Sequence, residues 1–196
     1  MWVWKTPGIP DEMFEQREGV PGPTKEEVRV LTVSKARLRD GSVVFDVGCG
    51  TGGLTVEAAL QVAPTGRVFA IDDDERAIEL TAANAARFAL GGTVQLIKGS
   101  APEALYSLPE ASAILVGGSR QLRGVLSAAY EKLISGGRIV VNAILLETAC
   151  SALGEMRKLG FKEVEVVSVS VAKGKAVESG TMMLARNPIT IISGTK

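Results

Sequence analysis

The chain has 196 residues, of which 46% are hydrophobic and 22% are charged, and its 22 basic and 22 acidic side chains give a formal net charge of zero. This length predicts a single domain with its own hydrophobic core, and high hydrophobicity without net charge excludes a disordered protein. The charge balance also disfavours a dedicated nucleic-acid binder, which usually carries a basic excess.

Cysteine and histidine usage restricts the chemistry further. The sequence contains no histidine, which excludes Ser-His-Asp and Cys-His catalysis and zinc sites that need histidine. Its two cysteines can form at most one disulfide, so a disulfide-framed fold is excluded as well. The first residues do not resemble a signal peptide, and no apolar run is long enough to span a membrane. We therefore expect a cytoplasmic protein with reduced thiols, no metal centre and no membrane segment.

The N-terminal two thirds of the chain show a regular alternation of elements. Residues 1–23 are rich in Pro and Gly and are expected to form an arm. Thr24 and the glutamates after it have capping-box spacing, which predicts that a helix begins there. Strands are then predicted at 43–47, 67–71, 93–97, 113–116 and 138–143, and further helices at 53–62, 74–89, 121–134 and 147–159. This alternation predicts βαβ units and a parallel sheet with helices on both faces.

The C-terminal part of the sequence has a different pattern. Valines alternate with serines up to residue 171, residues 172–180 are polar, and residues 181–192 are apolar again. Two strands joined by a polar loop predict a β-hairpin whose last strand runs antiparallel to a neighbour. The expected organisation is one domain, 1–196, with the arm at 1–23, a βα core at 24–160 and the hairpin at 161–196.

A glycine-rich turn, VFDVGCGTGG at residues 44–53, separates the first predicted strand of the core from the helix after it. Its glycines satisfy G-x-G-x-x-G and also G-x-G-x-G, and both patterns occur between a strand and a helix. Residues without a Cβ atom let the backbone turn sharply and approach a ligand closely. Three interpretations are open: a dinucleotide site at the helix N-terminus, a site for S-adenosylmethionine (SAM), and a tight turn without a ligand.

Two aspartates favour SAM among these ligands. Asp72 follows the second strand of the sheet, about twenty residues after the loop, where a carboxylate can accept hydrogen bonds from both hydroxyls of a ribose. Asp46 precedes the first glycine by two residues and completes D-x-G-x-G-x-G, the pattern of methyltransferases. The chain also has no room for the second, substrate-holding domain that a hydride-transfer enzyme usually needs.

Further segments outside the glycine loop carry a more specific similarity. They are GIPDEMF at 8–14, PTKEEVR at 23–29, SKARL at 34–38, APEAL at 101–105, GGS at 117–119, GGRIVVN at 136–142, LET at 146–148, and the closing pairs NP at 187–188 and II at 191–192. With these segments the chain resembles a class I SAM-dependent methyltransferase, and more narrowly the decarboxylating precorrin methyltransferases, nearly from end to end. The resemblance implies a Rossmann-like α/β fold with a mostly parallel seven-stranded sheet and an antiparallel last strand.

The narrower resemblance is to the cobalt-precorrin-6B C15-methyltransferases of cobalamin biosynthesis, equivalent to the C-terminal half of precorrin-6Y C5,15-methyltransferase. It implies methylation of C15 of a tetrapyrrole with loss of carbon dioxide from the acetate chain on ring C, SAM as the methyl donor, and a homotetramer. Carried onto this chain, it implies cofactor contacts from Thr24, Gly48, Cys49, Gly50, Thr51, Gly52, Asp72 and Ala101. The family often has Asp where this chain has Ser100, so the adenine contact would come from the Ser100 hydroxyl or from backbone. No catalytic acid or base is assigned.

Several of these residues have simpler interpretations. Thr24 could serve only as a helix cap, and Cys49 is interpreted as a small loop residue because no base marks it as a nucleophile. Cys150 is expected in the core. Arg120 and Arg123 are either a solvated helix start or a recognition patch for substrate carboxylates, with Lys25 and Arg17 on the arm as reserve candidates.

The function itself has two kinds of alternative. One is a methyltransferase of the same fold that acts on another small molecule or on RNA, although 5% aromatic residues and zero net charge count against RNA. The other is a nucleotide-binding module without catalytic activity.

The C-terminal run of β-forming residues further predicts a homo-oligomer with its interface at about residues 164–184.

Overall fold

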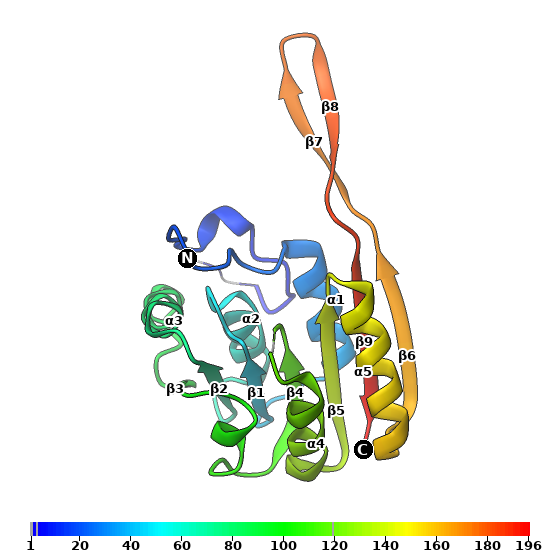
Figure 1. Ribbon diagram of the computed structural model, residues 1–196. Coiled ribbons are helices and arrows are strands. Elements are labelled where there is room, and N and C mark those ends of the chain that lie inside the picture. The colour runs from blue at the N-terminus through cyan, green and yellow to red at the C-terminus, as the bar shows by residue number, and fades with distance from the viewer. Residues whose placement is uncertain (1, 3, 119) are drawn as a thin grey trace.

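The computed structural model in Figure 1 describes residues 2, 4–118 and 120–196. Its centre is a seven-stranded sheet with the strand order β3-β2-β1-β4-β5-β9-β6. The strands are β1 Val43–Val47, β2 Arg67–Asp72, β3 Val94–Lys98, β4 Ala111–Val116, β5 Leu133–Ala143, β6 Lys162–Val169 and β9 Ile189–Thr195. Strands β1 to β5 pair in parallel, and β9 runs antiparallel to both β5 and β6. The predicted sheet with an antiparallel last strand is confirmed.

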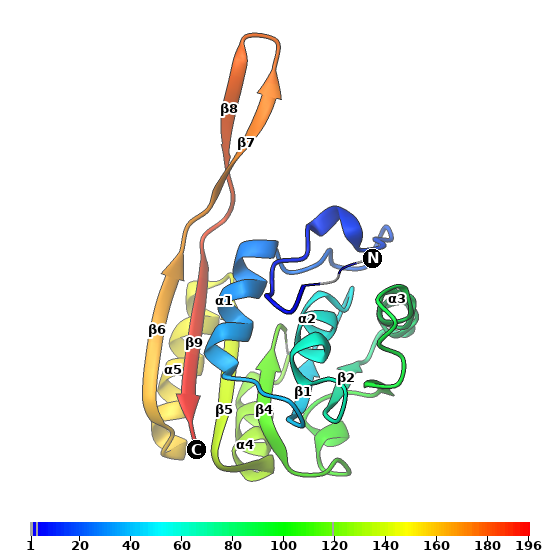
Figure 2. The same cartoon turned by 180° about the vertical axis from the view of Figure 1, so that it is seen from behind.

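Helices cover both faces of this sheet, as Figures 1 and 2 show. Helices α1 to α3 lie on one face and α4 and α5 on the other. Their bounds are α1 Glu26–Ala36, α2 Gly53–Val62, α3 Glu75–Arg87, α4 Leu122–Lys132 and α5 Leu146–Leu159, with 3₁₀ turns at Asp11–Met13 and Glu103–Leu105. No helix of the described residues is long and apolar enough to cross a lipid bilayer.

The central strands are buried on both faces because each face packs against helices. In β4, Ile114 and Val116 belong to the apolar cluster beneath α4 and α5, whereas Ala113 and Leu115 belong to the cluster beneath α1 and α2. Parallel strands covered in this way show continuous apolar runs in the sequence, and for that reason they were easy to predict.

The start of the first helix differs in detail from the prediction. Helix α1 begins at Glu26, but its N-cap is Lys25 and no side chain of the helix start forms a cap hydrogen bond. Instead, the Glu26 N–H donates to Oδ1 of Asp11, at 3.0 Å, from the N-terminal arm. The predicted Thr24 cap is therefore wrong, because a carboxylate that is distant in sequence takes the role. Asp74 caps α3 by accepting a hydrogen bond from the Arg76 N–H, and Gly160 ends α5 at φ 88°.

Two strand boundaries also differ. Strand β5 begins at Leu133, before the predicted start at residue 138, and its pairing with β4 shifts between Leu133 and Arg138, so Gly136 and Gly137 lie in an irregularity within the strand. After β6, the predicted polar loop is a second sheet: β7 Ala172–Val177 and β8 Gly180–Ala185 pair as a two-stranded ribbon that projects from the domain. Residues 181–192 are accordingly split between β8 and β9, and Pro188, which has no N–H to donate to a strand, lies in the break.

Candidate active site

A cavity of about 1010 Å³ opens at the carboxyl ends of the parallel strands. These ends face the N-terminal arm and the base of the ribbon in Figure 1. The wall is built from residues 21–25 of the arm, the loop after β1, the ends of β2 and β5, the residues 99–101, 117–118 and 120–121, and the base of the ribbon. In open α/β sheets this edge is where ligands bind.

The glycine loop forms one side of the cavity, and two of its glycines are needed for different reasons. Gly48 has φ 76°, and a Cβ atom there would lie 2.6 Å from the backbone oxygen of Gly118, so the loops after β1 and β4 could not approach. Gly50 has φ 54°, but the nearest atom to its Cβ position is 3.8 Å away. The Gly48 position therefore serves loop packing, and the Gly50 position leaves open space beside the cavity.

Asp72 stands beside this loop at the end of β2. Its Oδ2 accepts a hydrogen bond from the Gly50 N–H at 2.9 Å, and its Oδ1 accepts one from the Asp74 N–H at 3.0 Å. A carboxylate has about four lone-pair sites, so each oxygen can still accept a ligand hydroxyl. The loop thus orients this carboxylate and leaves acceptor sites for the ribose that the sequence analysis predicts here.

Asp46 is a buried carboxylate in the wall between β1 and the loop. It is 1% exposed, and its Oδ2 accepts a hydrogen bond from the Thr55 hydroxyl at 2.6 Å, whereas Oδ1 is buried with no partner among the described residues. Burial raises the pKa of Asp46 to about 6, and nearby Asp72 adds to the shift while the Thr55 hydrogen bond opposes it. The site therefore holds a carboxylate whose negative charge is poorly compensated by the protein.

A buried ionic cluster holds the N-terminal arm over the cavity. No pattern in the sequence indicates this cluster. The Arg29 side chain is fully buried and contacts Asp11 Oδ1 at 2.7 Å and Glu57 Oε1 at 3.4 Å. It also donates to the backbone oxygens of Ile9 and Thr24. The segment 21–25, which lines the cavity, is thereby fixed to the domain. Asp11 and Glu57 are 46 positions apart in the sequence, so no local pattern indicates that they share a cluster with Arg29.

Most of the predicted cofactor residues do come together. The cavity is lined by Thr24, Gly48, Cys49, Gly50, Thr51, Asp72 and Ala101, together with Ser100. Gly52 does not line it, because a Cβ atom there would meet Thr81 of α3 at 2.9 Å. The Cys49 thiol is buried, and burial raises its pKa, which agrees with the interpretation that it is no nucleophile.

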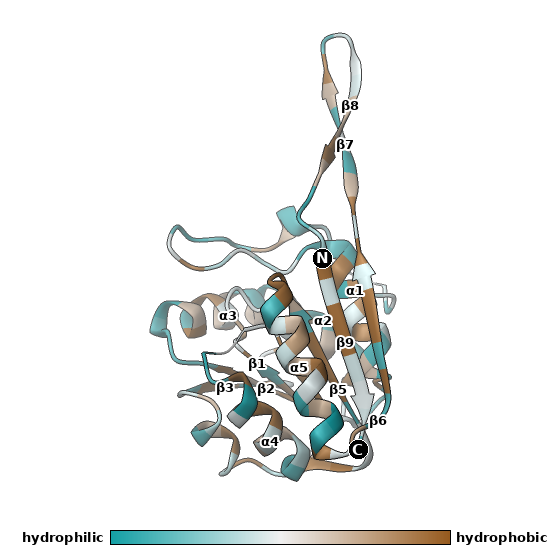
Figure 3. Ribbon diagram, turned by 45° about the vertical axis from the view of Figure 1, so that its right-hand side comes forward, coloured by the Kyte–Doolittle hydropathy of each residue, from teal (hydrophilic) through white to brown (hydrophobic). Residues whose placement is uncertain are grey.

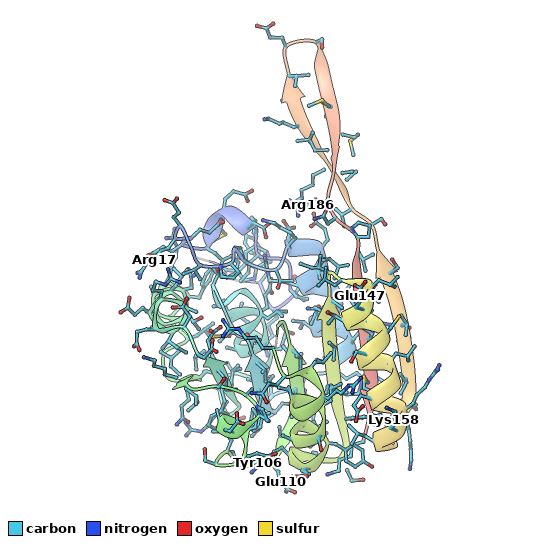
Figure 4. All side chains as sticks on the ribbon, in the orientation of Figure 1. Arg17, Tyr106, Glu110, Glu147, Lys158 and Arg186 are labelled. Atoms are coloured by element: carbon cyan, nitrogen blue, oxygen red, sulfur yellow. The ribbon has the colours of Figure 1, made fainter. Side chains whose placement is uncertain are left out.

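Of the predicted substrate residues Arg120, Arg123 and Arg17, only Arg120 lines the cavity. Arg120 lines the cavity, but its side chain is 93% exposed and lies 4.0 Å from Asp73. Arg123 does not line the cavity; it lines a neighbouring depression of about 440 Å³ beside Ser151, which Arg120 also borders. Arg17 does not line the cavity either and pairs with Glu15 and Glu79 at the outer side of the arm, where Figure 4 shows it.

Two further predictions concern single residues. Cys150 is exposed, so its predicted place in the core is wrong; α5 turns Ala149 and Ala152 inward instead. Ser119 of the predicted GGS segment lies outside the described residues. Among the described residues, no group of three or more cysteine, aspartate or glutamate side chains is arranged to hold a metal ion.

Comparison with known proteins shows the family of the chain. The model of the precorrin methyltransferase domain matches residues 14–196. The chain belongs to the precorrin methyltransferase family. A relative from Saccharolobus solfataricus, named probable cobalt-precorrin-6B C(15)-methyltransferase (decarboxylating), is 48% identical over 100% of this chain and 98% of its own length. A crystal structure described as precorrin 8W decarboxylase of Methanobacterium thermoautotrophicum is 44% identical, with a TM-score of 0.91 over 96% of this chain and 100% of that one.

The fold of this precorrin methyltransferase is also that of more distant enzymes. A SAM-dependent O-methyltransferase from Thermotoga maritima matches with a TM-score of 0.77 and 19% identity over 88% of this chain and 66% of that one, which shows the shared fold alone. The class I fold and the family together imply that the chain uses SAM. The site fits such a ligand, because it offers an open loop at Gly50, acceptors for hydroxyls on Asp72, and an unpaired buried carboxylate oxygen on Asp46.

Proposed function

We propose that the chain is a SAM-dependent C-methyltransferase of cobalamin biosynthesis, which methylates C15 of cobalt-precorrin-6B and removes carbon dioxide from the acetate side chain on ring C. The observation that carries this proposal is the family match over residues 14–196, joined by relatives of that name at up to 48% identity over the full chain. The cavity supports it, because its wall has two chemically different halves.

The first half of the cavity is polar and suits the methyl donor. It contains the loop from Gly48 to Thr51, with Asp46 and Asp72 at the ends of β1 and β2. We assign Asp72 to the ribose hydroxyls, the loop backbone to the amino-acid portion, and Ala101 with Ser100 to the adenine edge. SAM supplies a methyl group on an electrophilic sulfonium, so the chain's own task is to hold donor and acceptor in line.

The second half of the cavity is apolar and suits a macrocycle. It is lined by Val28 of α1, by Ile144 directly after β5, by Val169 and Val171 at and just after the end of β6, and by Ile189 at the start of β9. Such a wall excludes water from the bound ring and keeps it beside the polar half. Alignment of two bound reactants accounts for a large part of many enzymatic rate enhancements. No side chain of the cavity is assigned as a catalytic acid or base.

The assembly and surroundings of the enzyme belong to the same proposal. We assign it a tetrapyrrole substrate, no nucleic-acid partner, a cytoplasmic location and a homotetrameric assembly. The ribbon supports self-association because it exposes the apolar side chains of Val177, Met182, Met183 and Leu184, and Figure 3 shows hydrophobic colour along it. Exposed apolar surface on a projecting pair of strands favours contact with another chain.

The deciding experiment incubates the purified protein with SAM and cobalt-precorrin-6B and analyses the product by mass spectrometry. We expect the product to gain one methyl group and to lose one carbon dioxide. A parallel reaction with the metal-free precursor shows which form is used. Binding of SAM without any change in either tetrapyrrole would contradict the proposed substrate, and tight binding of NAD or ATP instead of SAM would contradict the methyltransferase itself.

A further inference from the structure

Two cationic side chains, Lys25 and Arg186, lie at the apolar half of the cavity, and Arg186 has no assigned role in the site. Lys25 is the N-cap residue of α1, and Arg186 follows β8 at the base of the ribbon. Both line the cavity, and Figure 4 shows Arg186 where the ribbon meets the domain. The side chains are 47% and 28% exposed, so both are reachable from the cavity mouth.

These two cations are held close together by one carboxylate. Oδ2 of Asp11 lies 3.4 Å from Lys25 Nζ and 3.8 Å from Arg186 Nη1. Arg186 Nη1 also donates to Glu27 Oε2 at 3.0 Å. Both contacts of the guanidinium use Nη1, and neither Nε nor Nη2 donates a hydrogen bond to any residue that the structure describes. A guanidinium has five N–H donors, so it can take a second carboxylate without giving up the first.

The position of the pair matches the charge distribution of the cavity. The acidic residues Asp46, Asp72 and Asp73 line the half at the ends of β1 and β2. Lys25 and Arg186 line the opposite half, next to the apolar wall. Arg120, the other cation of the wall, lies 4.0 Å from Asp73 and so belongs to the acidic half.

We propose that Arg186 and Lys25 form a clamp for one carboxylate side chain of the substrate and thereby fix how the macrocycle lies on the apolar wall. The identity of the ligand rests on the proposed function, since a corrin precursor is an apolar ring with carboxylate chains at its rim. A ring packed against Val28, Val169 and Ile189 places its rim at the edge of this wall, where the clamp stands. The planar guanidinium fork of Arg186 matches both oxygens of such a carboxylate.

The ribbon base offers a matched control. Lys173 on β7 contacts Glu26 at 2.9 Å and Glu27 at 3.1 Å, so it ties the ribbon to α1 just as Arg186 does. Unlike Arg186, Lys173 does not line the cavity. A role in holding the ribbon is therefore shared by both residues, whereas a role in binding substrate belongs to Arg186 alone.

The experiment compares Arg186→Gln, Lys25→Gln and Lys173→Gln with the wild type in steady-state kinetics. A hydrogen bond to a charged group contributes about 1.5–3 kcal/mol, so KM for cobalt-precorrin-6B should rise about tenfold or more in Arg186→Gln. The rise in KM should be smaller in Lys25→Gln, because an ammonium contacts a carboxylate as a point charge and not through a planar fork. Affinity for SAM should stay within about twofold in all three. Lys173→Gln should keep the wild-type KM.

A binding assay separates the clamp from the proposed reaction. The probes are uroporphyrin, an unreactive tetrapyrrole with eight carboxylates, and its uncharged methyl ester, titrated by fluorescence. We expect the wild type to bind the acid more tightly than the ester, and Arg186→Gln to lose most of this difference. If this pattern holds while cobalt-precorrin-6B is not converted, the clamp stands and the proposed function fails. Equal effects of Arg186→Gln and Lys173→Gln, or equal binding of acid and ester by the wild type, would overturn the clamp.

Discussion

Replacement of Arg29 by methionine tests how the arm is held over the cavity. The Arg29 guanidinium lies between the carboxylates of Asp11 and Glu57, and the side chains of Arg29 and Glu57 are both fully buried. Glu57 also accepts the N–H groups of Gly8 and Ile9, at 3.0 and 2.9 Å. Burial raises the pKa of Glu57, and these hydrogen bonds and Arg29 only partly offset it. Methionine fills a similar volume but leaves Glu57 without its cation and leaves Asp11 with only the longer contacts to Lys25 and Arg186.

The expected loss follows from this geometry. Removing one partner of a buried ion pair costs about 3–5 kcal/mol, because the remaining charge is left without compensation. For a domain of this size each kcal/mol lowers Tm by about 2–4 °C, so we expect Tm to fall by about 6–20 °C. The arm should also loosen, since Asp11, Thr24 and Ile9 all lose a contact.

Denaturant unfolding and limited proteolysis measure the two effects separately. Arg29→Lys keeps the charge without the fork and should lose less stability than Arg29→Met. The matched control is Arg37→Met, whose cation is 64% exposed and pairs with Glu163 at the surface, and which should leave Tm unchanged. A loss below about 1 kcal/mol in Arg29→Met, with the arm still resistant to protease, would refute the view that this cluster fixes the arm.

Three further predictions concern the loop, the carboxylate beside it and the ribbon. Asp72→Ala should weaken SAM binding by about 1.5–3 kcal/mol in calorimetric titration while the fold survives, and unchanged affinity would remove the ribose assignment. Gly48→Ala should lower Tm more than Gly50→Ala, because both carry the cost of a positive φ but only the first also meets backbone, at Gly118; equal losses would contradict this. Replacement of residues 172–185 by a short Gly-Ser linker should convert an oligomer to a monomer in light scattering, and a wild-type monomer at micromolar concentration would contradict the assembly.

The elements that carry local signals could be predicted from the sequence. Strands β1, β2 and β4 are buried on both faces, so each contains a run of apolar residues that only Asp46 in β1 and Ser112 in β4 interrupt. The glycine loop and Asp72 were found because a sharp turn needs residues without a Cβ and because the two are about twenty residues apart in a βαβ unit. The whole of the polar half of the cavity has this local character.

The contacts that complete the cavity on the other side join distant parts of the chain. The Glu26 N–H is capped by Asp11 from 15 residues away, Lys173 reaches Glu26 across 147 residues, and Arg186 reaches Glu27 across 159 residues. No periodicity of the sequence encodes such pairs. The sequence therefore gives no signal for Arg186, and it favours Arg123 only through its place after β4, whereas the direction of its side chain depends on how α4 packs.

The last prediction concerns Asp46 and the dependence of stability on pH. The pKa of this carboxyl rises from 3.8 to about 6 on folding, chiefly through burial. The folded protein therefore holds this proton more tightly than the unfolded chain, and the contribution of Asp46 to wild-type stability should fall as pH rises from about 4 to about 7. A shift of about two pKa units corresponds to about 3 kcal/mol. Asp46→Asn has no charge at this position, so its stability relative to wild type should increase by up to about 3 kcal/mol over the same range.

Unfolding free energies of wild type and Asp46→Asn at a series of pH values measure this difference, and other titrating groups cancel in the comparison. Asp73→Asn removes an exposed carboxylate of the same cavity wall and serves as the control for the loss of a charge at this wall. A carboxylate that destabilises the free protein at neutral pH is useful if its charge meets a cationic ligand, and SAM carries positive charge on its sulfonium and its ammonium. SAM should accordingly bind more tightly as pH rises through about 6 in the wild type, and this dependence should vanish in Asp46→Asn. If the difference in unfolding free energy between wild type and Asp46→Asn did not change with pH, burial would not raise the pKa of Asp46 and the reasoning would be refuted.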